Sequence, residues 1–207
     1  MTSKEKILEN IKLSTVNKNV ILDDVEYLYD KKDLSVKFKN ALKSVSAEFL
    51  IFSNYDETVE IINSYFPNQK RCINTIKEIN ISGLDLSKIN NPTDFHPLDL
   101  SIIKGDFAVA ENGAIWINTG DLPDRTIPFL CENLIIIIDG HNIVGDMHEA
   151  YHKTDGIDYS YGTFITGPSK TADIEQTLVV GAQGPRKMLV LISENSFYKN
   201  TNTKQIP

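Results

Sequence analysis

Residues 134–139 read LIIIID, an apolar run that meets no polar residue until its last position. Strands with one exposed face alternate between apolar and polar residues, so a short continuous run is typical of a strand covered on both faces. A membrane-spanning helix needs about 20 apolar residues, and no stretch of the chain approaches that length. The run therefore predicts a buried strand inside a sheet.

Strand-like and helix-like segments alternate on both sides of this run. We expect strands at residues 48–52, 71–76, 162–167 and 186–192, and helices at residues 3–13, 35–45, 56–65, 144–153 and 171–181. Residues 106–120 alternate and carry Gly113, as a hairpin would, whereas residues 80–97 have the composition of a loop. This order predicts a three-layer α/β fold with a mostly parallel sheet and helices on both faces.

The length of 207 residues suits one domain with a substantial core. We expect an N-terminal helix and irregular arm at 1–34, an α/β core at 35–195 and a tail at 196–207. Charged residues occupy the start of the chain where a signal peptide would need an apolar run, so a cytoplasmic location is expected.

The net charge of −7 and the lack of a basic stripe argue against nucleic acid as a partner. Cys72 and Cys131 are the only cysteines, too few for the four thiolates of an ordinary iron–sulfur cluster. Each lies in or beside an apolar segment, so both are expected to be buried structural thiols. No metal and no cofactor is expected.

The sequence FITGPSKTADIEQTLVV predicts a strand, a sharp turn and a helix. Gly167 allows a tight exit from the strand, and the hydroxyl of Ser169 or Thr171 could cap the helix. Helix N-termini beyond the carboxyl ends of parallel strands bind anions, so a phosphate or carboxylate could bind there. The alternative is a well-formed turn without a ligand, in which acidic residues of the first helical turn only stabilise the helix dipole.

The segments DFAVAENGAIWI, ITGPSKTADIE and GAQGPRKMLVLI together resemble the LUD domain family of the lactate-utilisation C type. The resemblance covers about residues 100–193, and the three motifs keep the family's order. The positions that match the family pattern are Glu111, Gly113, Thr166, Gly167, Pro168, Ser169, Thr171, Asp173, Glu175, Gly184, Pro185 and Arg186.

The resemblance implies a fold similar to the NagB/RpiA/CoA-transferase group and an association with iron–sulfur proteins that oxidise L-lactate to pyruvate. The chain lacks cluster-ligating cysteines and any dinucleotide fingerprint, which favours an accessory subunit that does not perform the redox step. The alternative is a stand-alone enzyme or sensor that binds a small anion, such as a CoA ester, a sugar phosphate or a carboxylate.

The chain departs from two elements of the family pattern, at three positions. Asn112 and Ala114 stand where the family has threonines, so two hydroxyl groups are lost. Gln183 stands where histidine is usual, and glutamine does not titrate. A proton-transfer role for that histidine therefore does not carry over to this chain.

The candidate ligand-binding residues are Thr166, Gly167, Pro168, Ser169, Lys170, Thr171, Gly184 and Arg186. The candidate catalytic residues are Glu111, Asp173 and Glu175, which could hold a metal, share a proton or act as a general base if they converge. Glu111 is also the candidate nucleophile for CoA-transferase-like chemistry. In the alternative reading, Glu111 pairs with Arg186 or Lys170 and only orders the turns. The functional reading places all three loops around one pocket.

Residues 148–152 read HEAYH and match the H-E-x-x-H zinc-protease pattern. Two histidines four residues apart on a helix could reach one metal, but catalytic zinc needs a third protein ligand. Asp155 and Asp158 occupy the positions of glycine and histidine in the extended pattern, so a zinc site is not predicted. Val144, Met147 and Tyr151 are expected to face the core. His96 and His141 are interpreted as isolated polar residues.

Overall fold

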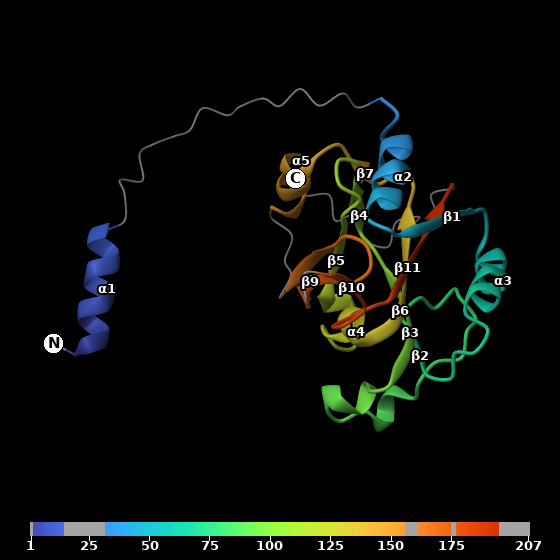
Figure 1. The fold of residues 1–207 in the computed structure, drawn as a ribbon, viewed down its shortest axis with the longest axis horizontal. Coiled ribbons are helices and arrows are strands. Elements are labelled where there is room, and N and C mark those ends of the chain that lie inside the picture. The colour runs from blue at the N-terminus through green and yellow to red at the C-terminus, as the bar shows by residue number, and fades with distance from the viewer. Residues whose placement is uncertain (1, 15–31, 156–160, 175–176, 195–207) are drawn as a thin grey trace, which may run out of the picture.

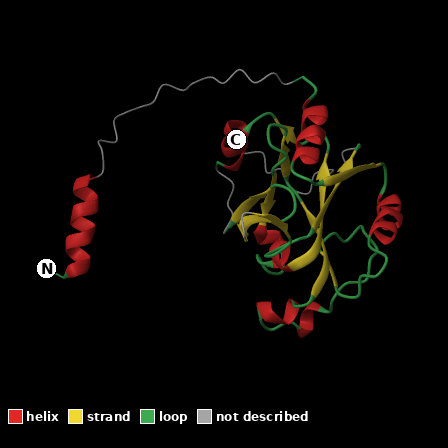
Figure 2. Ribbon diagram, viewed as in Figure 1, coloured by secondary structure: helices red, strands yellow, loops and turns green. Residues whose placement is uncertain are grey.

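A computed structural model describes residues 2–14, 32–155, 161–174 and 177–194 (Figures 1 and 2). The main sheet contains five strands in the order β1 (Glu48–Phe52), β11 (Lys187–Ser193), β6 (Cys131–Asp139), β3 (Leu98–Lys104) and β2 (Cys72–Asn74). Every neighbouring pair in this sheet is parallel. The α/β fold with a mostly parallel sheet is therefore confirmed.

Strand β6 explains the apolar run of the sequence. It pairs with β3 on one side and β11 on the other, so it lies in the interior of the sheet. Ile136 and Ile138 point into one hydrophobic cluster, whereas Ile135 and Ile137 point into the other. Because successive side chains of a strand face opposite sides, both sets must be apolar when both faces are covered.

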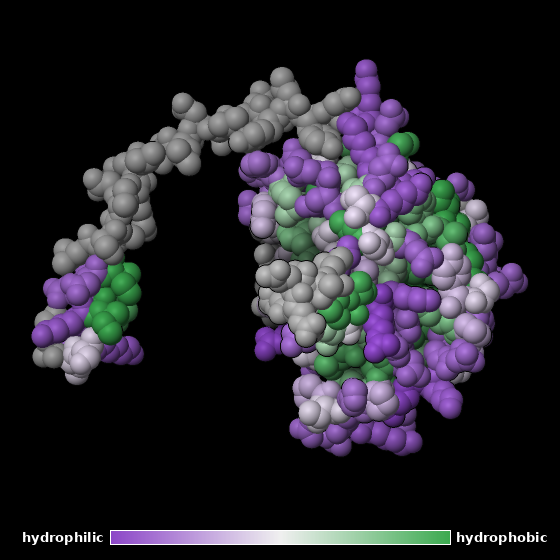
Figure 3. All heavy atoms as spheres, viewed as in Figure 1, coloured by the Kyte–Doolittle hydropathy of each residue, from purple (hydrophilic) through white to green (hydrophobic). Residues whose placement is uncertain are grey.

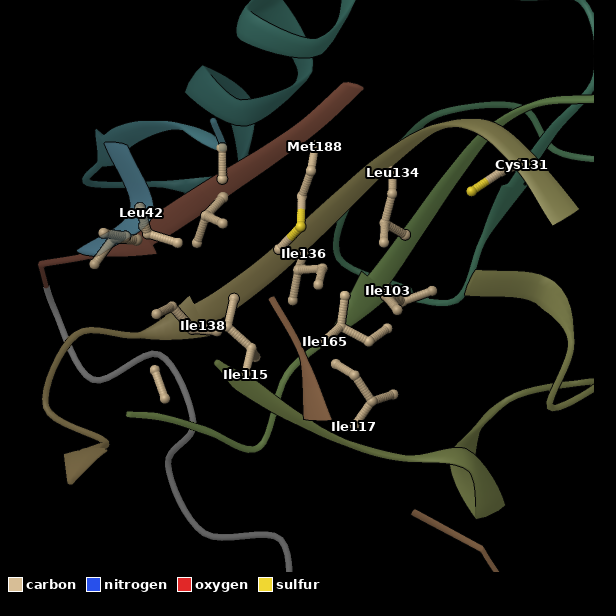
Figure 4. Packing of buried hydrophobic residues seen from close by; sticks show 14 of the residues in the cluster. Leu42, Ile103, Ile115, Ile117, Cys131, Leu134, Ile136, Ile138, Ile165 and Met188 are labelled. Atoms are coloured by element: carbon tan, nitrogen blue, oxygen red, sulfur yellow. The ribbon is translucent and has the colours of Figure 1, made fainter. Parts of the chain in front are cut away.

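One face of the main sheet is covered by α3 (Tyr55–Tyr65), which packs Ile62 against it. The other face is covered by α2 (Leu34–Ser44), through Phe38 and Leu42, and by a second sheet (Figure 4). Figure 4 shows Ile115, Ile117 and Ile165 of the second sheet directed toward the side chains of the main sheet. The core is thus two apolar layers, one on each side of the parallel strands.

The second sheet has the order β7 (Ile143–Val144), β4 (Phe107–Val109), β5 (Ile115–Asn118) and β8 (Gly162–Ile165). Strands β4 and β5 form an antiparallel pair, as the alternation of residues 106–120 predicts. The outer face of this sheet is covered by α5 (Met147–Thr154), which packs Ala150 against Phe107, Trp116 and their neighbours.

The helix predicted over residues 171–181 is wrong. The chain instead forms β9 (Lys170–Ile174) and β10 (Thr177–Val180), which pair as antiparallel strands. The segment is rich in β-branched residues, which lose side-chain freedom in a helix and suit a pleated strand. Without a helix here, neither the expected cap at Ser169 or Thr171 nor the expected N-terminal anion site exists.

The remaining elements are short or separate from the core. Helix α1 (Ser3–Ser14) carries Ile7, Leu8 and Ile11 on one side, as predicted (Figure 3). Helix α4 (Ile127–Leu130) and three 3₁₀ turns (Leu86–Lys88, Pro92–Phe95 and Thr119–Asp121) lie in the connections. Among the described helices, none has the length and apolarity that crossing a membrane would need.

The two cysteines are buried free thiols, as predicted. Burial is the main reason why the pKa of Cys72 is raised to about 12 and the pKa of Cys131 to about 11. Both thiols therefore stay protonated at neutral pH, which fits a packing role.

Candidate functional site

Ser169 joins two glycine-rich turns that are separate in the sequence. Its backbone N–H donates to the Pro185 carbonyl at 2.8 Å, and its hydroxyl donates to the Gln183 carbonyl at 2.9 Å. The Ser169 carbonyl accepts the N–H of Gly181 at 2.9 Å. The turn at residues 166–170 and the turn at residues 181–186 therefore form one unit, called the glycine clasp below.

The clasp is also attached to the C-terminal end of α2. Gly167 has φ = 72°, and a Cβ atom at this position would lie 2.6 Å from the Val45 carbonyl oxygen. The Lys170 ammonium donates to the same oxygen at 2.6 Å. Glycine is thus required here both by the positive φ and by the close approach of another backbone.

These contacts change the role of the predicted ligand donors. The hydroxyl hydrogen of Ser169 and one ammonium hydrogen of Lys170 are already bound to backbone carbonyls. Lys170 retains two further hydrogens and its side chain is exposed. The geometry supports an ordered turn with a polar outer surface more directly than it supports an enclosed anion cradle.

The other clasp residues divide between the interior and the surface. Pro168 is buried, whereas Thr166 is exposed. Gly184 approaches Ser169, since an added Cβ would lie 3.1 Å from the Ser169 Cβ. Arg186 forms an exposed ion pair with Glu132 at 3.4 Å. Thr171 belongs to β9 and is partly buried.

The clasp lies at the amino ends of the parallel strands. Arg186 directly precedes β11, and its N–H donates at 2.8 Å to the carbonyl of Glu132, the second residue of β6. The expected position beyond the carboxyl ends of the strands is therefore wrong. The error follows from the missing helix, because the rule for ligand sites concerns strands that lead into helices.

Glu111 lies between β4 and β5 and contacts the start of α5. Its carboxylate accepts the Met147 N–H at 3.1 Å, and its own N–H donates to the Gly145 carbonyl at 3.0 Å. The suggested pairing of Glu111 with Arg186 or Lys170 is wrong, because those cations contact Glu132 and Val45 instead.

The predicted convergence of three carboxylates stays a prediction. Asp173 lies within β9, but its side chain falls outside the described part of the structure, as does all of Glu175. Gly113, two residues after Glu111, has φ = 75° and lies close to α2, because a Cβ added there would be 3.2 Å from the Leu42 nitrogen. The loop of Glu111 therefore contacts the second half of α2, and the clasp contacts Val45, the residue that caps the C-terminal end of the same helix.

The H-E-x-x-H pattern lies on α5, where its glutamate has a structural role. Glu149 accepts the Gly145 N–H at 2.7 Å and donates its own N–H to the side chain of Asp146 at 2.9 Å. Both histidines, His148 and His152, are exposed. Among the described residues, no group of three His, Cys, Asp or Glu side chains is placed to hold a metal ion.

The buried face of α5 differs from the predicted one. Ala150 and Thr154 are buried, whereas Tyr151 is 60% exposed, with its ring edge-on to the Phe164 ring at 5.7 Å between centroids. The expectation that Tyr151 faces the core is wrong, although Val144 and Met147 do pack against the core as predicted.

Sequence reasoning missed a pair of residues at the carboxyl end of β6. His141 was interpreted as an isolated polar residue, but its Nδ1 lies 3.1 Å from Oδ1 of Asp139. The same oxygen accepts the His141 backbone N–H at 2.9 Å. The sequence Asp-Gly-His directly after an apolar strand was the available signal, since polar residues at that position belong to the carboxyl edge of the sheet.

A second titratable group lies near this edge. Burial raises the pKa of Asp106, an effect reinforced by the nearby Asp121 charge and opposed by Lys104. The Asn118 backbone N–H donates a hydrogen bond to the Asp106 carboxylate and also opposes the rise. Asp106 is therefore a carboxyl group whose charged form is disfavoured by folding.

We expect Asp106→Asn to stabilise the protein at pH 7 but not at pH 3. A carboxyl group with a raised folded pKa binds its proton more tightly in the folded state than in the unfolded state. The free energy of unfolding that Asp106 contributes is therefore lost as pH rises above the unfolded pKa of about 3.9, and at pH 7 its charged form destabilises the folded state. Asparagine keeps an acceptor oxygen without the charge. Thermal unfolding should show a higher Tm than wild type at pH 7 and an equal Tm at pH 3. The exposed Asp155→Asn variant is the control, and a lower Tm for Asp106→Asn at pH 7 would contradict the assignment.

Comparison with known proteins adds independent information. The model of the LUD domain family matches residues 83–193, which include the Glu111 loop, α5 and the whole clasp. Lactate utilization protein C from Geobacillus sp. (strain WCH70) is 38% identical over 101 residues, and that from Anoxybacillus flavithermus (strain DSM 21510 / WK1) is 37% identical over 89 residues. The match to the Geobacillus protein covers 45% of this chain and 42% of that protein. The match to the Anoxybacillus protein covers 42% of this chain and 40% of that protein. The chain therefore spans less than half the length of these curated relatives.

A solved structure also resembles the fold. The crystal structure of a DUF162 family protein from Deinococcus radiodurans superimposes with a TM-score of 0.58 and covers 77% of this chain and 96% of that chain. The sequence identity is 16%, so this likeness supports the architecture alone.

Proposed function

Because the chain belongs to the LUD domain family, we propose that it is an accessory, non-redox component of a lactate-utilisation system that works with iron–sulfur proteins to oxidise L-lactate to pyruvate. The observation that carries the proposal is the family match over the clasp, together with relatives named lactate utilization protein C. The two cysteine thiols are buried and their pKa values are raised, which supports a role outside electron transfer.

The outer surface of the clasp is the proposed contact for a partner protein or a small anion. Thr166, Lys170 and Arg186 all have exposed side chains, while Gly167 and Ser169 hold the turns beneath them. A rigid turn that presents cationic side chains recognises acidic groups with little loss of conformational entropy on binding. This arrangement suits the binding of a partner protein or a small anion better than it suits catalysis within the clasp.

The alternative of a stand-alone enzyme has less support. A CoA-transferase-like mechanism would use Glu111 as the nucleophile, yet its carboxylate already accepts the Met147 N–H at the start of α5. Binding of a CoA ester, a sugar phosphate or a carboxylate at the clasp without turnover remains compatible with the exposed Lys170 and Arg186.

A complementation experiment tests the proposal. A strain lacking this chain should grow poorly on L-lactate and normally on pyruvate, and the wild-type chain should restore growth on L-lactate. The double variant Lys170→Glu/Arg186→Glu should fail to restore growth and should not co-purify with iron–sulfur partners, because charge reversal repels acidic contacts. The matched control is Lys88→Glu, which reverses an exposed charge on the 3₁₀ turn Leu86–Lys88, outside the clasp. Normal growth of the deletion strain on L-lactate would refute the proposal.

A further inference from the structure

A cleft lies at the carboxyl ends of β2 and β3, the end of the strands where ligands of open α/β sheets bind. It has one part of about 460 Å³ and one of about 260 Å³. The two parts adjoin, because they share the lining residues Thr75, Ile76, Lys77, Asp121 and Leu122. The first three residues follow β2 of the main sheet, and the other two follow β5 of the second sheet.

One wall of the cleft is a turn that Asn74, the last residue of β2, holds in place. The side-chain oxygen of Asn74 accepts the Ile76 N–H at 3.0 Å, and its amide group donates to the Ile79 carbonyl at 2.7 Å. The Ile79 N–H also donates to the Ile76 carbonyl at 3.1 Å, which closes the turn. Lys77 lies within this turn and has an exposed side chain. The backbone that carries the Lys77 ammonium is therefore ordered before any ligand binds.

The opposite wall is a turn that Asn118, the last residue of β5, holds in the same way. The side-chain oxygen of Asn118 accepts the Gly120 N–H at 3.0 Å. The hydroxyl group and the N–H of Thr119 both donate to the Tyr161 carbonyl, at 2.6 Å and 3.1 Å. Asp121 is the last residue of this 3₁₀ turn, so its carboxylate also stands on an ordered backbone.

The charges that line the cleft are balanced. They are the ammonium groups of Lys77 and Lys104 and the carboxylates of Glu78 and Asp121. Lys77 and Asp121 line both parts of the cleft, and neither forms an ion pair within the part of the chain that the structure describes. A ligand with one charge would meet attraction and repulsion together, whereas a ligand with both charges can direct each toward its opposite. The lining therefore favours a zwitterion.

The larger part of the cleft also has apolar walls. Ile76 and Ile79 are buried residues of its lining, and Leu86, Leu122 and Pro123 complete the apolar surface. Leu86 is 42% exposed, so an apolar group bound beside it would remove hydrocarbon surface from water. The cleft thus offers one charge of each sign and an apolar surface next to them.

We propose that this cleft binds an α-amino acid with an apolar side chain. Lys77 binds its carboxylate and Asp121 binds its ammonium group, both through charge-assisted hydrogen bonds. The apolar side chain of the ligand lies against Leu86 and Leu122. None of these residues belongs to the clasp, so the inference does not depend on the lactate-utilisation proposal.

Calorimetric titration of the full chain with L-leucine and three analogues tests the proposal. Isocaproate lacks the ammonium group, isopentylamine lacks the carboxylate and glycine lacks the apolar side chain. We expect saturable binding of L-leucine and at least about tenfold weaker binding of each analogue. The absence of saturable L-leucine binding would overturn the proposal, as would an analogue that binds as tightly as L-leucine. This comparison uses the wild-type protein alone, so a folding defect cannot obscure it.

Two variants separate the charged contacts. Lys77→Met should weaken L-leucine binding about tenfold without weakening isopentylamine binding, because that amine has no carboxylate. Asp121→Asn should weaken L-leucine binding about tenfold without weakening isocaproate binding, because isocaproate has no ammonium group. The matched controls are Lys70→Met, exposed before the amino end of β2, and Asp155→Asn, exposed at the end of α5, and they should change the affinity less than twofold. An unchanged affinity for L-leucine in Lys77→Met or in Asp121→Asn would contradict the assigned contacts.

Discussion

Gly167→Ala is expected to lower the free energy of unfolding by roughly 2–4 kcal/mol. The backbone of Gly167 has φ = 72°, a region that costs an L-residue about 1–2 kcal/mol. The added Cβ would also lie 2.6 Å from the Val45 carbonyl oxygen, so either α2 or the clasp must move. Such a movement would disturb the Lys170 contact to the same oxygen.

Urea unfolding followed by circular dichroism measures this loss. The matched control is Gly120→Ala in the 3₁₀ turn Thr119–Asp121, where φ is not positive and the nearest atom, at 3.2 Å, is the side-chain oxygen of Asn118. The control should stay within about 1 kcal/mol of the wild type. A Gly167→Ala variant as stable as this control would show that the clasp does not pack against α2.

Ile136→Ala is expected to lower the free energy of unfolding by roughly 2–5 kcal/mol. Ile136 is fully buried in β6, the strand that pairs on both sides, and it faces the layer between the two sheets (Figure 4). Removing three carbon atoms there leaves a cavity that neither sheet can close, because both are fixed by their backbone hydrogen bonds.

Ile51→Ala is the corresponding control in β1. Ile51 belongs to the same sheet but is 37% exposed, so its truncation should cost about 1 kcal/mol or less. Both variants can be compared by thermal and urea unfolding under the same conditions. Equal losses for Ile51→Ala and Ile136→Ala would contradict the two-layer core described above.

The main sheet was largely predictable because its strands carry a strong local pattern. The run at residues 134–139 and the strands at 48–52 and 186–192 are apolar enough to identify without tertiary information. Strand β3 (Leu98–Lys104) was missed, because Pro97 and the polar residues Asp99 and Ser101 interrupt its apolar pattern. Ser101 is nevertheless fully buried, and only the neighbouring strands reveal why.

The segment at residues 171–181 was not predictable from its hydrophobic spacing. Ile174 and Leu178 are four residues apart, and acidic residues stand where the first turn of a helix would favour them. Pairing between β9 and β10 outweighs this helical signal, since Val179 lies opposite Thr171 and Val180 opposite Lys170. Cross-strand contacts of this kind are absent from any local sequence window.

The candidate site was predictable in its parts but not in its arrangement. The motifs identified the turns that Ser169 joins, because glycine and serine at those positions are typical of tight turns. They could not show that Glu111 binds the start of α5 or that His141 is held by Asp139. The Glu111 contact depends on how two segments distant in sequence are placed in space. The His141 contact depends on the conformation of the turn that follows β6.

The pairing of β1 with β11 has a consequence for synthesis on the ribosome. Strands β2, β3 and β6 can associate in the order in which they emerge, because each lies beside the next in the sheet. Because Glu48 of β1 pairs with Leu189, the first of the five main-sheet strands to leave the exit tunnel is the last of them to find its neighbour. Nascent chains halted before residue 187 should therefore expose β1 to chaperones, and slow assembly is the expected result of such distant pairing.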